Sequence, residues 1–302
     1  MAIRVTSGMM STQMLSNLNR NLNRMDTMSN QISTGRKINK PSDDPVGVTY
    51  ALRYRAELAA NEQYQSNTDA AVSWLDATDS NMQQALDVVK RLKELAVQGS
   101  NGTLPDNGIE AVNLEVEELK KHLAEIGNSQ IRGKYIFNGQ TYDKQPYELS
   151  SGVTEYYDVE TDNQAVMYSI SEQVSFQINT SGSDFFGGKG EADNIFKVID
   201  NLSTALASGD QAAAQQELKN IESRSVKMQS SLSEVGARSN RVQLVQNRLS
   251  DESLNFTSLQ SKIEDADVAS LMIQASSAQT IYEAALKSSA QIMQPTLMDF
   301  MR

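Results

Sequence analysis

The chain has 302 residues, and its 27 Lys and Arg against 38 Asp and Glu give a net charge of -11. This balance argues against nucleic-acid binding, because neutralising phosphates takes clustered Lys and Arg, and the absence of cysteine excludes disulfides and thiolate chemistry. The sequence has no run of about 18 apolar residues, so it predicts no membrane-spanning helix. Its first residues lack the apolar segment of a cleaved signal peptide.

The first predicted helix carries apolar residues at alternating spacings of three and four, the spacing of a coiled-coil seam. Its series is Leu15, Leu18, Leu22, Met25, Ser29 and Ile32. Such a stripe is most often the core of a helical bundle. An isolated amphipathic helix is marginal in water, however, so this stripe needs a partner.

The segment that follows reads as a helix stop, an extended linker and a new helix start. Thr34-Gly35 supplies a glycine stop, and Pro41 holds the residue before it extended. Asp44-Pro45 then supplies an N-cap and a first-turn proline. Asp43 and Asp44 could also be read as paired catalytic carboxylates, but the capping role explains them better.

Three further helices show the same spacing. The second is marked by Val72, Leu75, Met82, Leu86, Val89 and Ala96, and the third by Ile109, Val112, Val116, Leu119, Leu123 and Ile126. The longest series runs from Ala214 to Ala266, in a stretch without proline. Unbroken, it would be about 80 Å long at 1.5 Å per residue, which predicts an elongated helical bundle or coiled coil.

The middle of the chain has a different composition. Eleven of the 18 aromatic residues lie between Tyr135 and Phe196. Alternating residues predict strands over 153–158 and 174–178, with a turn at 160–163 between them, and the glycines of 182–190 predict a loop. We therefore expect a small β-rich insertion over 140–190 in a mainly α-helical protein.

The last predicted helix carries a stripe of its own, with Val268, Leu271, Ala275, Ala278, Tyr282, Ala285 and Ile292. Strong patterning at both ends is unusual, since chain termini are normally poorly ordered. The two terminal stripes are expected to pair with each other or with other subunits. The predicted subunit-interface residues are Leu15, Leu18, Leu22, Met25, Ile32, Leu271, Tyr282, Ile292, Leu297 and Phe300.

Catalytic chemistry finds no support. His122 is the one histidine, and no cysteine or second histidine can join it at a metal. The glycines between Gly182 and Gly190 are wrongly spaced for a phosphate-binding loop, and Lys189 is followed by Gly190 where Ser or Thr is needed. We predict no catalytic, cofactor-binding or metal-binding residue, and no enzyme activity.

The stretch Ser33-Thr-Gly-Arg-Lys-Ile-Asn-Lys-Pro-Ser-Asp-Asp-Pro45 closely resembles the N-terminal signature of the flagellin-like family. Further similar segments are Asn67 to Leu75, Glu94 to Gln98, Gly133 to Gly139, Ile263 to Asp267, Tyr282 to Leu286 and Leu297 to Phe300. The resemblance covers both ends and most of the helical region, whereas 140–190 matches only loosely. The linker motif that carries it comprises Thr34, Gly35, Pro41, Asp43, Asp44 and Pro45.

The resemblance implies a layered, secreted subunit of the extracellular bacterial flagellum. The inner domain would be 1–40 with 262–302, the helical bundle with a short β element 41–139 with 191–261, and the outer insertion 140–190. It also implies flagellar type III export with a dedicated chaperone. The Pro-Ser-Asp-Asp-Pro form and the short insertion favour a hook–filament junction subunit, ringed with copies of itself between the other junction protein and flagellin.

Three alternatives stay open from the sequence. The nearest is a flagellin filament subunit of the same family. A secreted coiled-coil adhesin or effector is a more distant alternative, because it would not need matched patterns at two ends separated by a β insertion. An enzyme of unknown type is the third, and it would require a concave site with convergent polar groups.

Overall fold

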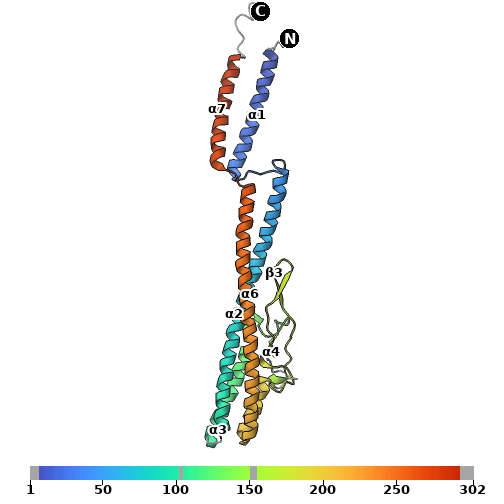
Figure 1. Ribbon diagram of the computed structural model, residues 1–302, viewed down its shortest axis with the longest axis vertical. Coiled ribbons are helices and arrows are strands. Elements are labelled where there is room, and N and C mark those ends of the chain that lie inside the picture. The colour runs from blue at the N-terminus through green and yellow to red at the C-terminus, as the bar shows by residue number, and fades with distance from the viewer. Residues whose placement is uncertain (1–6, 102–104, 150–154, 293–302) are drawn as a thin grey trace, which may run out of the picture. The chain divides into compact units, whose positions relative to one another are not determined.

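A computed structural model describes residues 7–101, 105–149 and 155–292 of the chain (Figure 1). The described part is mainly helical, as predicted, and carries two small β-hairpins. The long helices are α1 (Ser7–Thr34), α2 (Pro45–Ser100), α3 (Asp106–Gly127), α5 (Ile195–Ser208), α6 (Gln211–Glu264) and α7 (Val268–Ile292). The chain divides into a terminal unit, 1–60 with 252–302, and a central unit, 61–251.

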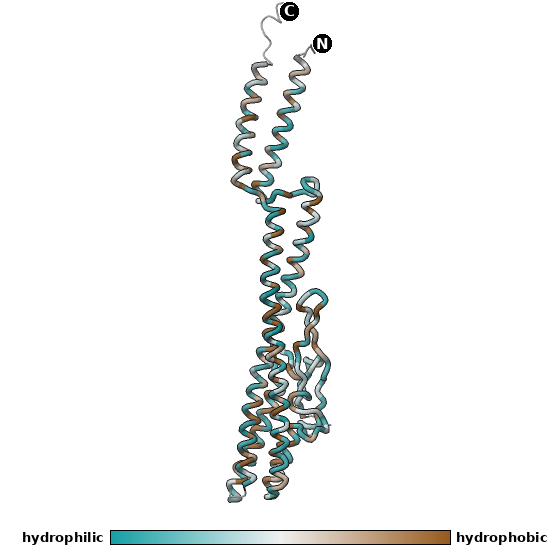
Figure 2. The backbone as a smooth tube through the Cα atoms, viewed as in Figure 1, coloured by the Kyte–Doolittle hydropathy of each residue, from teal (hydrophilic) through white to brown (hydrophobic). Residues whose placement is uncertain are grey.

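Two long helices pair in the central unit. In α6 a residue is buried at every seventh position: Ala214, Ile221, Met228, Val235, Val242 and Leu249. In α2 the same interval gives Asn61, Thr68, Leu75, Met82, Val89 and Ala96. A strict seven-residue repeat is the pattern of a left-handed coiled coil, and Figure 2 shows apolar positions recurring between polar ones along α6. The predicted series from 214 to 266 is thus confirmed as a helix of 54 residues, ending at Glu264.

An aromatic cluster fills the core beside these helices. Phe137, Phe185, Phe186 and Phe196 are fully buried, and Tyr147 is 4% exposed. Their ring centroids lie 4.9 to 5.9 Å apart, in stacked, tilted and edge-on pairs. Burial raises the pKa of the Tyr147 hydroxyl well above its ordinary value. The cluster is continuous with the buried faces of α2, α3, α5 and α6.

The β structure consists of two antiparallel hairpins. One joins β1 (Gln130–Ile131) to β2 (Lys134–Tyr135), and the other joins β3 (Met167–Ser171) to β4 (Val174–Gln177). The predicted strand at 174–178 is therefore confirmed over 174–177.

The predicted strand over 153–158 is wrong where it can be compared, because Tyr156–Asp158 form a 3-10 helix, η1. Tyr156 and Tyr157 are neighbours in sequence, yet both pack on the same core, which a strand of period two cannot achieve. Val153 and Thr154 lie outside the described residues. The predicted loop over 182–190 is also partly wrong. Gly182–Phe186 form a short helix, α4, because the Ser181 side chain caps it by accepting the Ser183 N–H.

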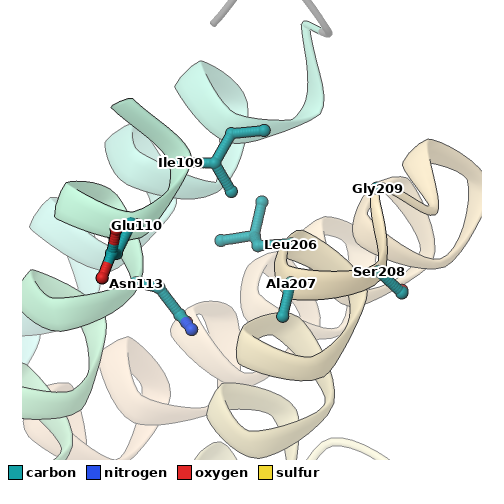
Figure 3. A pocket seen from close by; sticks show the side chains of 7 residues that line it. All are labelled: Ile109, Glu110, Asn113, Leu206, Ala207, Ser208 and Gly209. Atoms are coloured by element: carbon teal, nitrogen blue, oxygen red, sulfur yellow. The ribbon is translucent and has the colours of Figure 1, made fainter. Parts of the chain in front are cut away.

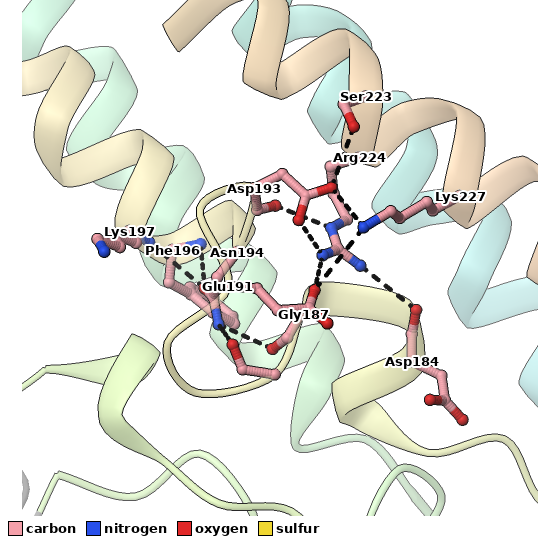
Figure 4. A network of polar contacts seen from close by, with 11 residues as sticks. Asp184, Gly187, Glu191, Asp193, Asn194, Phe196, Lys197, Ser223, Arg224 and Lys227 are labelled. Atoms are coloured by element: carbon pink, nitrogen blue, oxygen red, sulfur yellow. Dashed lines mark hydrogen bonds and ion pairs between the residues drawn. The ribbon is translucent and has the colours of Figure 1, made fainter.

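The loop after α4 is held to α6 by a buried arginine (Figure 4). The Arg224 side chain is 1% exposed, and its Nε donates to the Asp193 carbonyl oxygen at 2.8 Å. Its Nη2 donates to Asp193 Oδ1 at 2.7 Å and also to the Glu191 carboxylate. Burial would raise the pKa of the Asp193 carboxyl, but Lys227 and Arg224 outweigh it and hold that pKa below its ordinary value. Loop 187–194 is therefore fixed to α6 by charge-assisted bonds.

The predicted division into three domains stays a prediction. The central unit contains both the 140–190 segment and the helices on which it packs. The terminal unit holds α1, α7 and the adjoining ends of α2 and α6.

Candidate assembly interface

Helices α1 and α7 lie side by side in the terminal unit (Figure 1). On α1 the less exposed positions include Met14, Leu18, Asn21, Met25, Met28 and Ile32. On α7 they include Val268, Leu271, Ala275, Ala278, Tyr282 and Ala285. Both series alternate spacings of three and four, so the pair is joined by a coiled-coil seam. Asn21 Nδ2 donates to the Ala278 carbonyl oxygen at 3.0 Å, a polar contact that favours one register.

The predicted interface residues fall into two sets on this helix pair. Leu18, Met25, Ile32, Leu271 and Tyr282 line the seam. Leu15 and Leu22 are 59% and 43% exposed, so they lie beside the seam, and their role at a subunit interface stays a prediction.

The remaining predicted interface residues cannot be placed. The Ile292 side chain, Leu297 and Phe300 lie outside the described residues.

The apolar surface of α1 is wider than one partner helix covers. The seam consists of two adjacent rows of residues, one at positions 14, 21 and 28 and the other at 18, 25 and 32. Leu15 and Leu22 form a third, exposed apolar row beside the seam. The sequence analysis missed Met14, Asn21 and Met28. The predicted series and the observed one both contain Leu18, Met25 and Ile32, so the spacing of apolar residues alone does not distinguish them. Further exposed apolar side chains of the pair are Met9, Met10, Met272, Ile273, Ile281 and Leu286. An apolar surface of this kind marks an interaction site.

The linker between α1 and α2 is built as predicted. Helix α1 ends at Thr34, and Gly35 follows with φ +68, a conformation that favours glycine. Helix α2 begins at Pro45, and Asp44 Oδ1 accepts the N–H groups of Val46 and Gly47 at 3.1 and 3.0 Å. The predicted N-cap is thus confirmed.

Asp43 has a different role from its neighbour. Its Oδ2 accepts the N–H groups of Asn39 and Lys40 at 3.0 and 2.8 Å. These two bonds, first that from Lys40, lower the pKa of the Asp43 carboxyl. Pro41 is exposed and lies within the turn that the carboxylate closes. The two aspartates therefore shape the linker separately and do not form a catalytic pair.

The linker contacts the junction between α6 and α7. Arg36 and Asp265 form an isolated antiparallel bridge. The Lys37 N–H donates to the Glu264 carbonyl oxygen at 2.6 Å, and the Ala266 N–H donates to the Gly35 carbonyl oxygen at 3.0 Å. Two of the segments that resemble the flagellin-like family, Ser33–Pro45 and Ile263–Asp267, thus meet at one joint.

Glu264 is the buried charge of this joint. Its side chain is 3% exposed, and its Oε2 lies 2.7 Å from Arg55 Nη2 and 3.8 Å from Arg36 Nε. Burial alone would raise the pKa of Glu264, but hydrogen bonds from Arg55 and Gln260 and the nearby arginine charges outweigh it, so the pKa is lowered. Sequence reasoning missed this pair, because Arg55 and Glu264 are 209 residues apart and nothing local links them.

The cavity between α3 and α5 shows no arrangement of catalytic side chains. A cavity of about 390 Å³ lies between α3 and the end of α5 (Figure 3). Its lining is Ile109, Glu110, Asn113, Leu206, Ala207, Ser208 and Gly209, which provides no nucleophile paired with a base. His122 is exposed on α3, with Nδ1 3.5 Å from Glu125 Oε2. Among the described residues, no cluster of acidic or histidine side chains could hold a metal ion.

Membrane insertion has no structural support in the part of the chain that the structure describes. None of its helices combines the length and the apolar character needed to cross a bilayer.

Comparison with known proteins gives two family matches. Residues 5–141 match the bacterial flagellin N-terminal helical region, and residues 218–301 match the bacterial flagellin C-terminal helical region. The matched segments contain all of α1 and α7 and the joint between the linker and α7, and residues 142–217 lie between the two matches.

Individual relatives include both junction and filament proteins. Flagellar hook-associated protein 3 of Salmonella typhimurium is 24% identical over 213 residues, and the match covers 68% of this chain and 67% of the length of that protein. Flagellin of Bacillus subtilis is 22% identical over 285 residues, covering 89% and 90%. The crystal structure of the flagellar junction protein FlgL from Legionella pneumophila covers 72% of this chain and 100% of its own, with 16% identity and a TM-score of 0.58. At that identity the structural likeness concerns the fold.

Proposed function

This chain belongs to the bacterial flagellin family, and we propose that, within this family, it is the junction subunit between the flagellar hook and the filament. As a flagellin-family protein it is an axial structural protein of the extracellular flagellum and not an enzyme. Its place on the flagellar axis, between the hook and the filament, is proposed.

The observation that carries the proposal is the fold match to the Legionella junction protein, which extends over that protein's entire solved chain. The similarity to hook-associated protein 3 of Salmonella typhimurium supports it from the sequence side. The central segment supports it as well, because the described residues of 128–194 (128–149 and 155–194) contribute two small hairpins, η1, α4 and connecting loops. A modest outer segment suits a subunit present as a short adaptor.

The terminal unit provides the surface for assembly. Leu15 and Leu22 on α1 and Ile273 and Ile281 on α7 are between 43% and 72% exposed. Fully burying one such side chain stabilises by about 2 kcal/mol, so a ring of subunits would gain substantially by covering them. The proposed partners are other copies of this chain, the second junction protein on the hook side and flagellin on the filament side. A flagellar export chaperone would cover the same surface before assembly.

A filament subunit is the second candidate. The observation that favours it is the similarity to Bacillus subtilis flagellin over 89% of this chain. Both candidates use the same terminal helices, so the terminal unit cannot separate them.

Electron microscopy of a deletion strain tests the proposal. Loss of a junction subunit leaves complete hooks without filaments, and unpolymerised flagellin accumulates in the medium. Complementation with the intact gene restores filaments. Hooks without filaments and no flagellin protein in the medium would instead identify the chain as the filament subunit.

A further inference from the structure

The second hairpin lies beside both long helices of the central unit, and its two outer edges have different neighbours (Figure 1). On one side Asn67 Nδ2 of α2 donates to the Ser169 carbonyl oxygen of β3 at 2.8 Å. On the other side the Arg241 guanidinium of α6 lies 5.2 Å from the centroid of the Phe176 ring of β4. The outer edge of β3 is therefore turned toward α2, and the outer edge of β4 lies on the α6 side.

Alternate backbone groups of β4 have no partner along this outer edge. In an antiparallel ladder, residue pairs that exchange hydrogen bonds alternate with pairs that do not. The Ile178 N–H donates to the Val166 carbonyl oxygen at 3.1 Å, so the register makes Gln177 and Ser175 members of the non-bonded pairs. Their N–H and C=O groups point away from β3, just as the carbonyl of Ser169, opposite Ser175, points away from β4. Among the described residues, no hydrogen bond reaches the backbone N–H or C=O of Ser175 or Gln177.

A groove runs along β4 and is bounded by one face of α6. Its volume is about 390 Å³, within the range of ligand-binding clefts. Its lining comprises Ser175, Phe176 and Gln177 of β4 with Glu234, Ala237, Arg238 and Arg241 of α6. We call it the β4 groove. Two residues with unpaired backbone groups thus line a space that can hold a short extended segment.

The outer edge of β4 lacks the features that usually prevent strand addition. Edge strands of natural proteins carry a charged residue or a proline, contain a bulge, or are covered by another element. Strand β3 has a register irregularity between Ser169 and Ser171 and the contact from α2. Strand β4, Val174–Gln177, contains neither a charged residue nor a proline. An uncovered edge of this kind is a template for an added strand.

The groove also presents one arginine whose charge is not neutralised. Arg238 pairs with Glu234 Oε1 at 2.5 Å, so its charge is already balanced. Arg241 forms no ion pair with any residue that the structure describes. Its contact with the Phe176 ring positions the guanidinium without neutralising it. A guanidinium held in this way is suited to a carboxylate, with which it forms charge-assisted hydrogen bonds.

We propose that the β4 groove binds an extended acidic peptide segment of a partner protein, which adds a strand to β4 and places an Asp or Glu side chain against Arg241. An extended backbone presents donors and acceptors at the spacing that Ser175 and Gln177 require. The partner is a protein other than this chain, because none of the strands in the described residues contains Asp or Glu. The inference does not depend on the place of the chain in the flagellum.

The first test addresses the backbone contacts with a synthetic peptide, acetyl-Thr-Val-Glu-Val-Thr-Val-amide, and amide-resolved hydrogen exchange. With saturating peptide the Ser175 and Gln177 amides should exchange about tenfold more slowly, whereas the Phe176 amide, already bonded to β3, should change little. Unchanged exchange at Ser175 and Gln177 would overturn strand addition.

Two N-methylated forms of the peptide sharpen this test. A strand pairs through every second amide on one edge, so methylation of one alternate set of amides should abolish binding and methylation of the other set should not. Equal binding of the two methylated forms, or its loss in both, would also overturn strand addition.

The second test addresses the charge and has a matched control. Arg241→Gln should weaken binding of the same peptide about fivefold, the scale of an exposed ion pair. Lys219→Gln removes the same charge from an exposed position of α6 outside the groove, so it should leave the affinity unchanged. Equal affinities in the two variants would overturn the pairing of a carboxylate with Arg241.

The third test addresses the source of the segment. In the absence of peptide, the Ser175 and Gln177 amides should exchange at the same rate at low and high protein concentration. Protection of these amides that grows with protein concentration would overturn a separate partner and make a second copy of the chain the occupant.

Discussion

The buried carboxylate of Glu264 offers the sharpest perturbation of the joint between the linker and α7. Glu264→Gln keeps the shape of the side chain and one acceptor but removes the charge that Arg55 and Arg36 contact at 2.7 and 3.8 Å. A hydrogen bond to a charged group stabilises by about 1.5–3 kcal/mol. The arginine side chains are 42% and 50% exposed and regain water when the charge is lost, so we expect a net loss of about 1–2 kcal/mol.

The effect should depend on pH in a defined direction. The folded pKa of Glu264 lies below its ordinary value of 4.5, so the charge stabilises the folded state above that value. This stability is lost as the pH falls through the lower, folded pKa. The difference between the wild-type protein and Glu264→Gln should therefore be full at neutral pH and should narrow in the acid range.

Hydrogen exchange at the joint measures this directly. The amide groups of Lys37 and Ala266 donate across it, so their exchange rates report its opening. We expect both amides to exchange about tenfold faster in Glu264→Gln at neutral pH. Glu57→Gln is the control, because its pair with Arg53 is 3.8 Å long and exposed on both sides. Unchanged exchange at Lys37, or a difference that persists undiminished in acid, would refute the reasoning.

Three further changes test other parts of the account. Leu22→Asp should leave the melting temperature of the purified protein within about 2 °C of wild type but abolish motility. Met28→Asp, in the seam, should lower the free energy of unfolding by about 3 kcal/mol in the same thermal melt. A large melting shift for Leu22→Asp would place that residue in the core of its own chain. Asp44→Ala should lower stability by about 1 kcal/mol in denaturant titration, and no loss would remove its capping role. Phe186→Ala should cost about 3–5 kcal/mol and lower the helical circular dichroism transition, whereas an unshifted helical transition would show that 140–190 is a separable domain.

The sequence predicted those features that local chemistry and periodicity determine. The buried positions of α6 and the shielded face of α7 follow seven-residue repeats that are legible without a structure. The Asp44 cap and the Gly35 stop follow from the preferences of single positions. In each case the neighbours that matter lie within a few residues or one helical face.

Other features depend on contacts that no local pattern specifies. The seam of α1 takes Met14, Asn21 and Met28, and leaves Leu22 outside, because the position of α7 selects among adjacent apolar columns. Helix η1 replaces a predicted strand, because the aromatic core determines which way two neighbouring tyrosines point. The charge pair of Glu264 with Arg55 depends on the chain's return after 209 residues.

The location of the protein on the flagellum tests the central proposal most directly. The chain has no cysteine, so Glu172→Cys, on the exposed turn of the second hairpin, creates a single labelling site. Motile cells producing this variant would be labelled with a thiol-reactive fluorophore, with the filament outlined in a second colour. A junction subunit gives one spot at the base of each filament, where it meets the hook. Label along the whole filament would contradict the proposal and identify a filament subunit.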